Sequence, residues 1–383
     1  MIYLDNGATT YPKPCSVSES VMNALRFTAG SPGRGGHSQT IKAGETVYRT
    51  REIIAEMFNC DSENVIFTDN CTTSLNTAIK GVCKKGDRVL TSSLEHNSVL
   101  RPLEKLREKG IISFGIFRVS PQSDEETLEG IRSLMRLKPK AIVCTFASNV
   151  FGTVLPIERI GRLCRESDVV FIVDGAQAAG SIKIDMKKMN IDILCLPGHK
   201  GLYGPMGTGL MLLSGRVMPD ELTQGGTGSY SMDEKQPHSV PDRYESGTLN
   251  FPGIAGLYSG VRFIRSCGGE DAVHGKEMEL IDILESDLSA VRHIRLYPEM
   301  KSALRSPILS FNVDGFHSEE VSSLLDKCGV AVRAGYHCAK LAHESYGTSE
   351  IGCVRVTPGF FNTKKDIKNF VFYCNKIAMR QKI

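Results

Sequence analysis

Short apolar runs alternate with amphipathic segments over residues 16–250 of the chain. The apolar runs have the near-continuous hydrophobic character of strands that are buried on both faces. They predict strands at residues 64–68, 87–92, 141–146, 169–173, 191–196 and 209–213. Apolar positions at helical spacing between them predict helices at residues 45–58, 72–82, 99–109 and 157–166. The alternation predicts an α/β fold with a mostly parallel sheet and helices on both faces.

The pattern changes after residue 250. Helical spacing recurs at residues 257–265, 277–291, 318–327 and 364–379, and strand-like runs occur at residues 307–313, 330–333 and 352–357. We therefore expect a large domain over residues 16–250. A smaller α+β domain is expected to comprise residues 251–383 together with the N-terminal segment 1–15.

Composition narrows the class of protein. The 383 residues are enough for two domains, and 41% hydrophobic with 23% charged residues is typical of a globular protein. The net charge of +3 gives no reason to expect a nucleic-acid or membrane partner. The start of the chain lacks the basic and apolar regions of a signal peptide, and no apolar stretch is long enough to span a membrane. We expect a cytoplasmic protein.

The chain has 12 cysteines, none of them in a C-x-x-C pair. The usual spacing of a zinc site is therefore missing, and we expect no metal. Reduced thiols in the cytoplasm are the expectation for such a chain. Most of these cysteines lie in apolar runs and fit the role of small buried hydrophobic residues.

Two segments carry the strongest chemical signal. Lys200 lies in the glycine-flanked stretch Leu196-Pro-Gly-His-Lys-Gly, and Asp174 ends the apolar run Val169-Val-Phe-Ile-Val-Asp. A lysine that holds an aldehyde cofactor and an aspartate on the pyridinium nitrogen are the two parts that pyridoxal phosphate (PLP) requires. Taken alone, Lys200 fits a surface lysine better, and Asp174 fits an ordinary strand-end aspartate equally well. A P-loop is excluded, because no Gly-x-x-x-x-Gly-Lys-Ser/Thr segment is present.

Further residues fit the same cofactor. Gln177 follows Asp174 closely enough to reach the phenolic oxygen, and His96, after a predicted strand, offers a flat ring to stack on the pyridine. Thr72 and Thr73 open a predicted helix, whose free N–H groups and dipole suit a phosphate. Simple helix capping and a hydrogen-bonded loop histidine are the alternatives.

One cysteine departs from the buried pattern. Cys338 lies in a polar turn with Arg333 and His337, in surroundings that favour a thiolate. Arg355, in a predicted strand, suits a bidentate clamp on a substrate carboxylate, with a surface ion pair as the alternative.

Taken together, these segments resemble PLP-dependent class V aminotransferases of fold type I, and more narrowly the cysteine desulfurases. The motif near Cys338 is similar to that of the group II branch, which includes selenocysteine lyase-like enzymes. The matching segments are Tyr3-Leu-Asp-Asn-Gly-Ala-Thr-Thr10, Glu95-His96, Ser148-Asn-Val-Phe-Gly152, Asp174-Gly-Ala-Gln177, Gly198-His-Lys200, Glu245-Ser-Gly-Thr-Leu-Asn250, Arg333-Ala-Gly-Tyr-His-Cys-Ala339 and Arg355-Val-Thr-Pro-Gly-Phe-Phe-Asn-Thr363.

The resemblance implies further roles. Lys200 would hold PLP as a Schiff base, Asn149 would lie near the phenolic oxygen and the substrate, and His199 would contact the phosphate with Thr73. Gly247 and Thr248 would reach the phosphate of a neighbouring subunit, which implies a homodimer with shared sites. The substrate-binding residues implied are Arg355, Arg333, Asn149 and His337, and the catalytic residues are Cys338, Lys200 and His96.

The implied reaction converts L-cysteine to L-alanine and leaves a persulfide on Cys338 for a protein acceptor, as in iron–sulfur cluster assembly. A selenocysteine lyase, another class V enzyme such as an aminotransferase, and a non-catalytic sulfur-relay protein remain alternatives. Three positions depart from the family pattern: Pro197 stands in place of serine, Gly201 is an additional residue after Lys200, and Tyr336 replaces a histidine.

Overall fold

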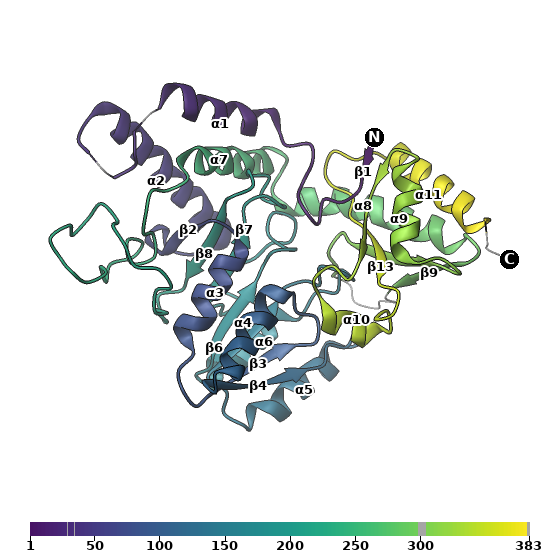
Figure 1. Ribbon diagram of the computed structural model, residues 1–383, viewed down its shortest axis with the longest axis horizontal. Coiled ribbons are helices and arrows are strands. Elements are labelled where there is room, and N and C mark those ends of the chain that lie inside the picture. Colours follow the sequence, from purple (N-terminus) through teal and green to yellow (C-terminus); the bar gives the residue numbers. More distant parts are fainter. Residues whose placement is uncertain (29, 34, 298–303, 381–383) are drawn as a thin grey trace.

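The computed structural model describes residues 1–28, 30–33, 35–297 and 304–380. A larger α/β part holds most of the N-terminal two thirds of the chain, and a smaller α+β part, which contains the start of the chain and its last described helix, lies beside it (Figure 1). No helix among these residues combines the length and the apolar character needed to cross a membrane.

A seven-stranded sheet forms the centre of the larger part, in the order β2-β8-β7-β6-β5-β3-β4. All neighbours from β7 to β4 are parallel, whereas β8 is antiparallel to both β2 and β7. The mostly parallel sheet expected from the sequence is therefore confirmed. The strands are β2 (Val65–Thr68), β3 (Asp87–Ser92), β4 (Ile112–Phe117), β5 (Ala141–Thr145), β6 (Val170–Asp174), β7 (Ile193–Pro197) and β8 (Gly209–Leu213).

Alternate residues of each strand enter two separate cores. In β6, Val170 and Ile172 pack with the helices of one face, while Phe171 and Val173 join the core of the other face. This division follows from the two-residue period of a strand and explains why the strands are apolar throughout. Helices α3 (Cys71–Val82) and α4 (Asn97–Glu108) cover the first face. The second is covered by α2 (Ser38–Phe58), α5 (Asp124–Met135), α6 (Ile157–Glu166) and α7 (Phe251–Ser266), with α1 (Cys15–Phe27) packed outside on α7.

Several elements of this part differ from the sequence expectation. Helix α2 begins at Ser38 rather than at residue 45, and α1, β4 and α5 were not predicted. Strand β4 is the last strand of the sheet and is only partly buried, so it lacks the continuous apolar run of the inner strands. Helix α1 buries only Val17 and Ala24, which leaves a weak apolar stripe. A short 3₁₀ helix, η1 (Ser62–Asn64), precedes β2.

The smaller part is an antiparallel sheet of order β12-β13-β10-β9, and its three longer helices cover one face. Its elements are α8 (Glu270–Ser289), β9 (Ile294–Tyr297), β10 (Leu309–Val313), α9 (Ser318–Asp326), β12 (Arg333–Gly335), α10 (Lys340–Tyr346), β13 (Cys353–Val356) and α11 (Lys364–Ala378). The single strand expected at 330–333 is wrong. It is two strands, because the chain leaves β11 (Val330–Ala331), which pairs with β1 (Ile2–Tyr3), and enters a different sheet at β12.

The N-terminal strand β1 lies against β11 in the smaller part. Helix α7 follows residue 250 but contributes Ile254, Leu257 and Val261 to the core of the large sheet. The division of the chain at residue 250 stays a prediction.

Candidate active site

The candidate site lies beyond the carboxyl ends of the parallel strands. Asp174 is the last residue of β6, Lys200 follows the end of β7 by three residues, and His96 lies in the turn after β3. A cavity of about 190 Å³ opens there. Its lining residues are Asn70, Cys71, Thr72, His96, Ser98, Thr145, Asn149, Asp174, Ala176, Gln177, Pro197, His199 and Lys200. Open α/β sheets bind ligands at this edge because loops from several strands converge there.

Lys200 is held in a tight, partly buried turn. Burial lowers the pKa of its amine to about 8, and Arg355 contributes in the same direction, while Asp174 opposes the change. The turn can form only because Gly201 has no side chain: a Cβ there would lie 2.2 Å from the carbonyl oxygen of Ala179. The uncharged amine, which is the form that acts as a nucleophile or base, is therefore more accessible near neutral pH than in an ordinary lysine.

Asp174 is buried, with 3% of its surface exposed. Its Oδ1 accepts hydrogen bonds from the backbone N–H of Ala176 at 3.0 Å and from the thiol of Cys71 at 3.4 Å. Both bonds end on the same oxygen, so Oδ2 is available to an N–H group of a ligand. A buried carboxylate with one free oxygen suits the protonated nitrogen of a pyridine ring.

The imidazole of His96 is fixed in a neutral form. Its Nδ1 accepts a hydrogen bond from the backbone N–H of Ser98 at 3.0 Å and lies 2.7 Å from the Ser98 hydroxyl. Burial lowers the pKa of His96, and the cations Lys200 and Arg333 act in the same direction, against the opposing effect of Asp174. A neutral ring can stack on an electron-poor aromatic cofactor without adding another charge to the cavity.

The expected phosphate residues divide between two cavities. Thr72 and His199 line the first, whereas Thr73 and Thr248 line a second cavity of about 200 Å³. Gly247 lines neither. Asn70 caps helix α3 by accepting the Thr73 N–H at 2.9 Å. Burial lowers the pKa of His199 to about 4.

Two arginines face each other beside the cavity. Arg333 of β12 is directly opposite Arg355 of β13, an arrangement of like charges that is unfavourable without an anion. Arg355 is 1% exposed and donates to Asp5 at 2.7 Å and to the carbonyl oxygen of Asn149 at 2.9 Å. Its Nε is buried without a partner, so the pair retains donor capacity for a further carboxylate.

The loop that carries Cys338 adjoins this region. The backbone N–H of Asn97, next to His96, donates to the carbonyl oxygen of Cys338 at 2.7 Å, and the side-chain amide of Asn149 donates to the carbonyl oxygen of His337 at 2.7 Å. His337 and Cys338 both have positive φ angles, 49° and 57°. Consecutive left-handed residues other than glycine are strained and are concentrated at functional sites. Cys338 is exposed, and neither it nor His337, Arg333 or Arg355 lines the first cavity.

The structure also places residues at the site that the sequence analysis did not assign. Asp5 binds Arg355, Ser98 orients His96, and Cys71 donates to Asp174. Asp5 lies in a segment that carried the family resemblance, but its contact spans most of the chain and leaves no local pattern. Gln177 lines the cavity as expected, and its side-chain amide donates to the Gly7 carbonyl oxygen at 3.0 Å.

The described residues fit PLP by their chemistry. The cavity has a lysine with a lowered pKa, a buried carboxylate with a free oxygen, and a neutral imidazole. Near its phosphate end, the buried Nδ1 of His199 has no hydrogen-bond partner, so an acceptor or donor is expected from a ligand.

Comparison with known proteins agrees with this chemistry. The family model described as "Aminotransferase class-V" matches residues 2–370. The chain belongs to the class-V aminotransferase family. Among curated relatives, probable cysteine desulfurases of Pyrococcus abyssi and Methanothermobacter thermautotrophicus are 30% and 29% identical to it. These alignments cover 97% and 96% of this chain and 92% of each relative. The apo structure of a cysteine desulfurase from Thermococcus onnurineus NA1 superposes with a TM-score of 0.90 at 26% identity, covering 99% of this chain and 94% of that chain.

The three departures from the family pattern have defined places in this class-V member. Pro197 is the last residue of β7 and lines the first cavity. Gly201 allows the close approach described above. The rings of Tyr336 and His343 make an edge-to-face contact with centroids 5.5 Å apart, and the Tyr336 hydroxyl donates to the carbonyl oxygen of Glu350 at 3.2 Å.

Proposed function

We propose that the protein is a PLP-dependent cysteine desulfurase. One observation carries the proposal: the exposed cysteine loop is hydrogen-bonded, through Asn97, to the turn that presents His96 to the cavity of Lys200 and Asp174. A nucleophilic thiol thus adjoins a site suited to PLP. The names of the curated relatives support the same activity.

The cofactor would be held by residues of the first cavity. Lys200 would carry it covalently, Asp174 would bind the pyridine nitrogen, and His96 would lie on the ring face. Gln177 and Asn149 would face the phenolic oxygen. The phosphate would lie near the start of α3, with Thr72, Thr73 and His199. When bound, PLP supplies an electron sink for a carbanion at the substrate α-carbon.

Side chains of the protein would bind the substrate and transfer its protons. Arg355 and Arg333 would bind the substrate carboxylate, since the pair has unused donor capacity. The amine of Lys200 would take the proton from the α-carbon and later return a proton to the product.

Sulfur transfer would follow at Cys338. Its thiolate attacks the substrate sulfur, an S–S bond forms, and the C–S bond breaks with its electron pair left on the substrate carbon. Protonation of that carbon gives alanine, and Cys338 keeps the added sulfur as a persulfide. The polar, exposed position of the loop lets an acceptor protein reach this persulfide.

Incubation of the purified protein with L-cysteine tests the proposal. We expect alanine, together with one added sulfur on the peptide that contains Cys338. The Cys338→Ala variant should keep the cofactor's visible absorption and lose alanine formation, whereas Cys328→Ala, which removes another exposed thiol, should retain it. Undiminished sulfide release by Cys338→Ala would contradict the assignment. Turnover of L-selenocysteine alone, or formation of the amine form of the cofactor with a keto acid, would support the alternatives instead.

We also propose a homodimer in a reducing compartment such as the cytoplasm. All twelve cysteines are free thiols, which suits a reducing environment. Thr248 lines the second cavity with Thr73, close to the start of α3, and the family resemblance assigns this loop to the phosphate of a partner subunit. Light scattering should give twice the chain mass, and a monomer that retains full activity would contradict shared sites.

A further inference from the structure

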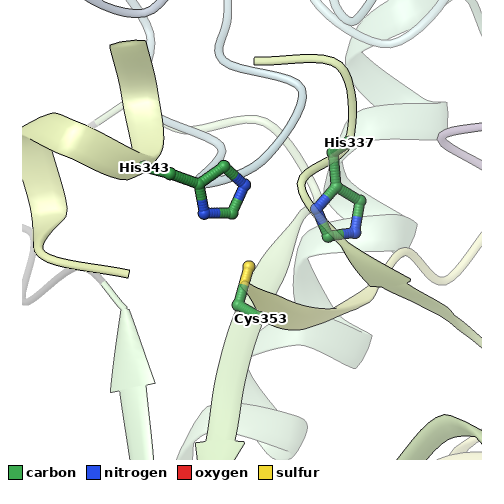
Figure 2. Close-up of side chains that lie close together, drawn as sticks. All are labelled: His337, His343 and Cys353. Carbon is green, nitrogen blue, oxygen red and sulfur yellow. The ribbon is translucent and has the colours of Figure 1, made fainter. Parts of the chain in front are cut away.

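Three buried side chains of the smaller part meet behind the Cys338 loop. His337 comes from that loop, His343 from α10 and Cys353 from β13, and they are 4%, 1% and 0% exposed. One ring nitrogen of each histidine and the cysteine sulfur all lie within 4.8 Å of one another. Figure 2 shows the two imidazole rings on either side of a common space, with the sulfur of Cys353 directed into it.

The two histidines are prepared as ligands by their other ring nitrogens. Nε2 of His337 lies 3.4 Å from the Arg333 carbonyl oxygen, and Nδ1 of His343 lies 2.7 Å from the Thr348 hydroxyl. Nδ1 of His337 and Nε2 of His343 are buried without any hydrogen-bond partner. A metal-binding imidazole has this arrangement, in which the outer nitrogen is held by oxygen and the inner one is free.

The unpartnered nitrogens need a common partner. The thiol of Cys353 makes no hydrogen bond with either nitrogen in the structure, so both buried nitrogens lack a partner, which is costly in a native core. Imidazole and thiolate are the ligands that zinc and neighbouring transition metals prefer, whereas magnesium and calcium prefer oxygen. A tetrahedral zinc ion places such ligand atoms about 3.3 to 3.8 Å apart, given its bond lengths of about 2.0 to 2.3 Å. The ligand atoms of the cluster lie within 4.8 Å of one another, so reaching this spacing requires a contraction of at most about 1.5 Å.

We infer that His337, His343 and Cys353 form a binding site for a zinc-class transition metal, with a fourth coordination position left for a solvent or small-molecule ligand. The ion would connect the loop, α10 and β13, and so hold the strained backbone that presents Cys338. The site differs from the cofactor cavity, because none of its three ligands lines that cavity. No step of the proposed desulfurase reaction is needed for this inference.

Charged side chains near the cluster limit which metal ions it can bind. Arg355 lies on the same side of β13 as Cys353, two residues further along, and Arg333 is opposite Arg355. Both cations oppose a metal ion, but Asp5 neutralises Arg355 at 2.7 Å, and a Cys353 thiolate would supply a negative charge to the ion directly. We therefore expect a site that binds thiophilic metals and rejects magnesium.

Cobalt(II) titration of the full-length protein tests the site, because tetrahedral Co²⁺ has strong d–d bands at wavelengths where PLP does not absorb. We expect one equivalent of Co²⁺ to give these bands, Zn²⁺ to abolish them by competition, and Zn²⁺ to raise the melting temperature by a few degrees. Cys353→Ala and, separately, His343→Gln should lose the bands. Cys374→Ala is the matched control, since it removes another fully buried cysteine of the same part, and it should keep them.

Cys338→Ala should also keep the bands, because the exposed thiol is not a ligand in this site. Three results would overturn the inference: no tetrahedral bands in the parent protein, bands that persist in the folded Cys353→Ala and His343→Gln variants, or bands that disappear in Cys338→Ala. The first result would mean that the cluster binds no tetrahedral metal ion. The last would move metal binding to the exposed loop.

Discussion

Replacement of Lys200 by methionine should stabilise the cofactor-free protein at neutral pH. The amine of Lys200 has a lowered pKa in the folded chain, first because of burial and second because of Arg355. A methionine of similar length keeps the apolar stem but has no charge to desolvate. Lys200, which the proposed chemistry requires, should therefore lower the stability of the folded cofactor-free protein. Such a loss of stability is common at functional sites.

The size and sign of this effect follow from the two pKa values. At about 1.4 kcal/mol for each pH unit of pKa difference, the fall from 10.5 to about 8 costs the folded apo chain about 3 kcal/mol. The folded state binds fewer protons than the unfolded state between these pKa values, so its stability rises with pH in that interval. The penalty is complete below about pH 8 and disappears as the pH rises past 10.5.

Urea denaturation of the apo forms at pH 7 and pH 10 measures the effect. Lys200→Met should exceed the parent in free energy of unfolding by about 3 kcal/mol at pH 7, and by less than about 1 kcal/mol at pH 10. Lys42→Met, at an exposed position of α2, controls for the loss of a surface lysine and should show no such pH-dependent difference. The reasoning is refuted if the difference between Lys200→Met and the parent is the same at both pH values, or if the parent is the more stable at pH 7.

Three further substitutions test other contacts. Asp174→Asn removes the charge offered to the pyridine nitrogen and should lower the rate of alanine formation at least about 100-fold. Initial rates measure this loss, and circular dichroism checks that the fold is retained. An unchanged rate would contradict the role of the carboxylate. Arg355→Lys replaces the planar, two-pronged guanidinium with a single ammonium group and should raise the KM for L-cysteine about 10-fold with a smaller change in kcat. A change in kcat alone would argue against carboxylate binding. Glu245→Ala leaves the buried Arg51 guanidinium, now 2.5 Å from Glu245, without its carboxylate and should reduce the free energy of unfolding by about 3 kcal/mol or more. The double variant Arg51→Met with Glu245→Leu should recover much of that loss in urea denaturation, and equal losses in both variants would show that the unpaired charge is not the cause.

The inner strands and several helices could be predicted because burial on two faces leaves a local pattern. β6 and β7 are continuous apolar runs, and α3 and α6 have apolar residues at helical spacing. Strand β4 was not predicted, because it is the partly buried edge strand of the sheet and has no continuous apolar run. Helix α5 carried a signal that was not used: Ser123 caps it, and Asp124, Glu125 and Glu126 follow in its first turn.

For the candidate site, residue types and motifs in the sequence identified the chemical groups. They did not give the arrangement of these groups in space. The cavity does bring together Lys200, Asp174, His96 and Gln177, all named from the sequence. It does not include Thr73, which lines a different cavity. Which oxygen of Asp174 is free, and which tautomer Ser98 imposes on His96, depend on hydrogen bonds that no spacing rule specifies.

The sequence by itself therefore determined the fold class and the chemical groups, since hydrophobic period and residue type act over a few neighbours. The tertiary structure decided the antiparallel direction of β8, the division of residues 330–333 between two sheets, and the position of Arg333 opposite Arg355. It also decided the meeting of His337, His343 and Cys353, where the sequence led us to expect no metal. Each of these features joins segments that are far apart in the chain and meet only when the core packs. The hydrophobic burial that brings them together comes from the whole fold, so no single stretch of sequence predicts it.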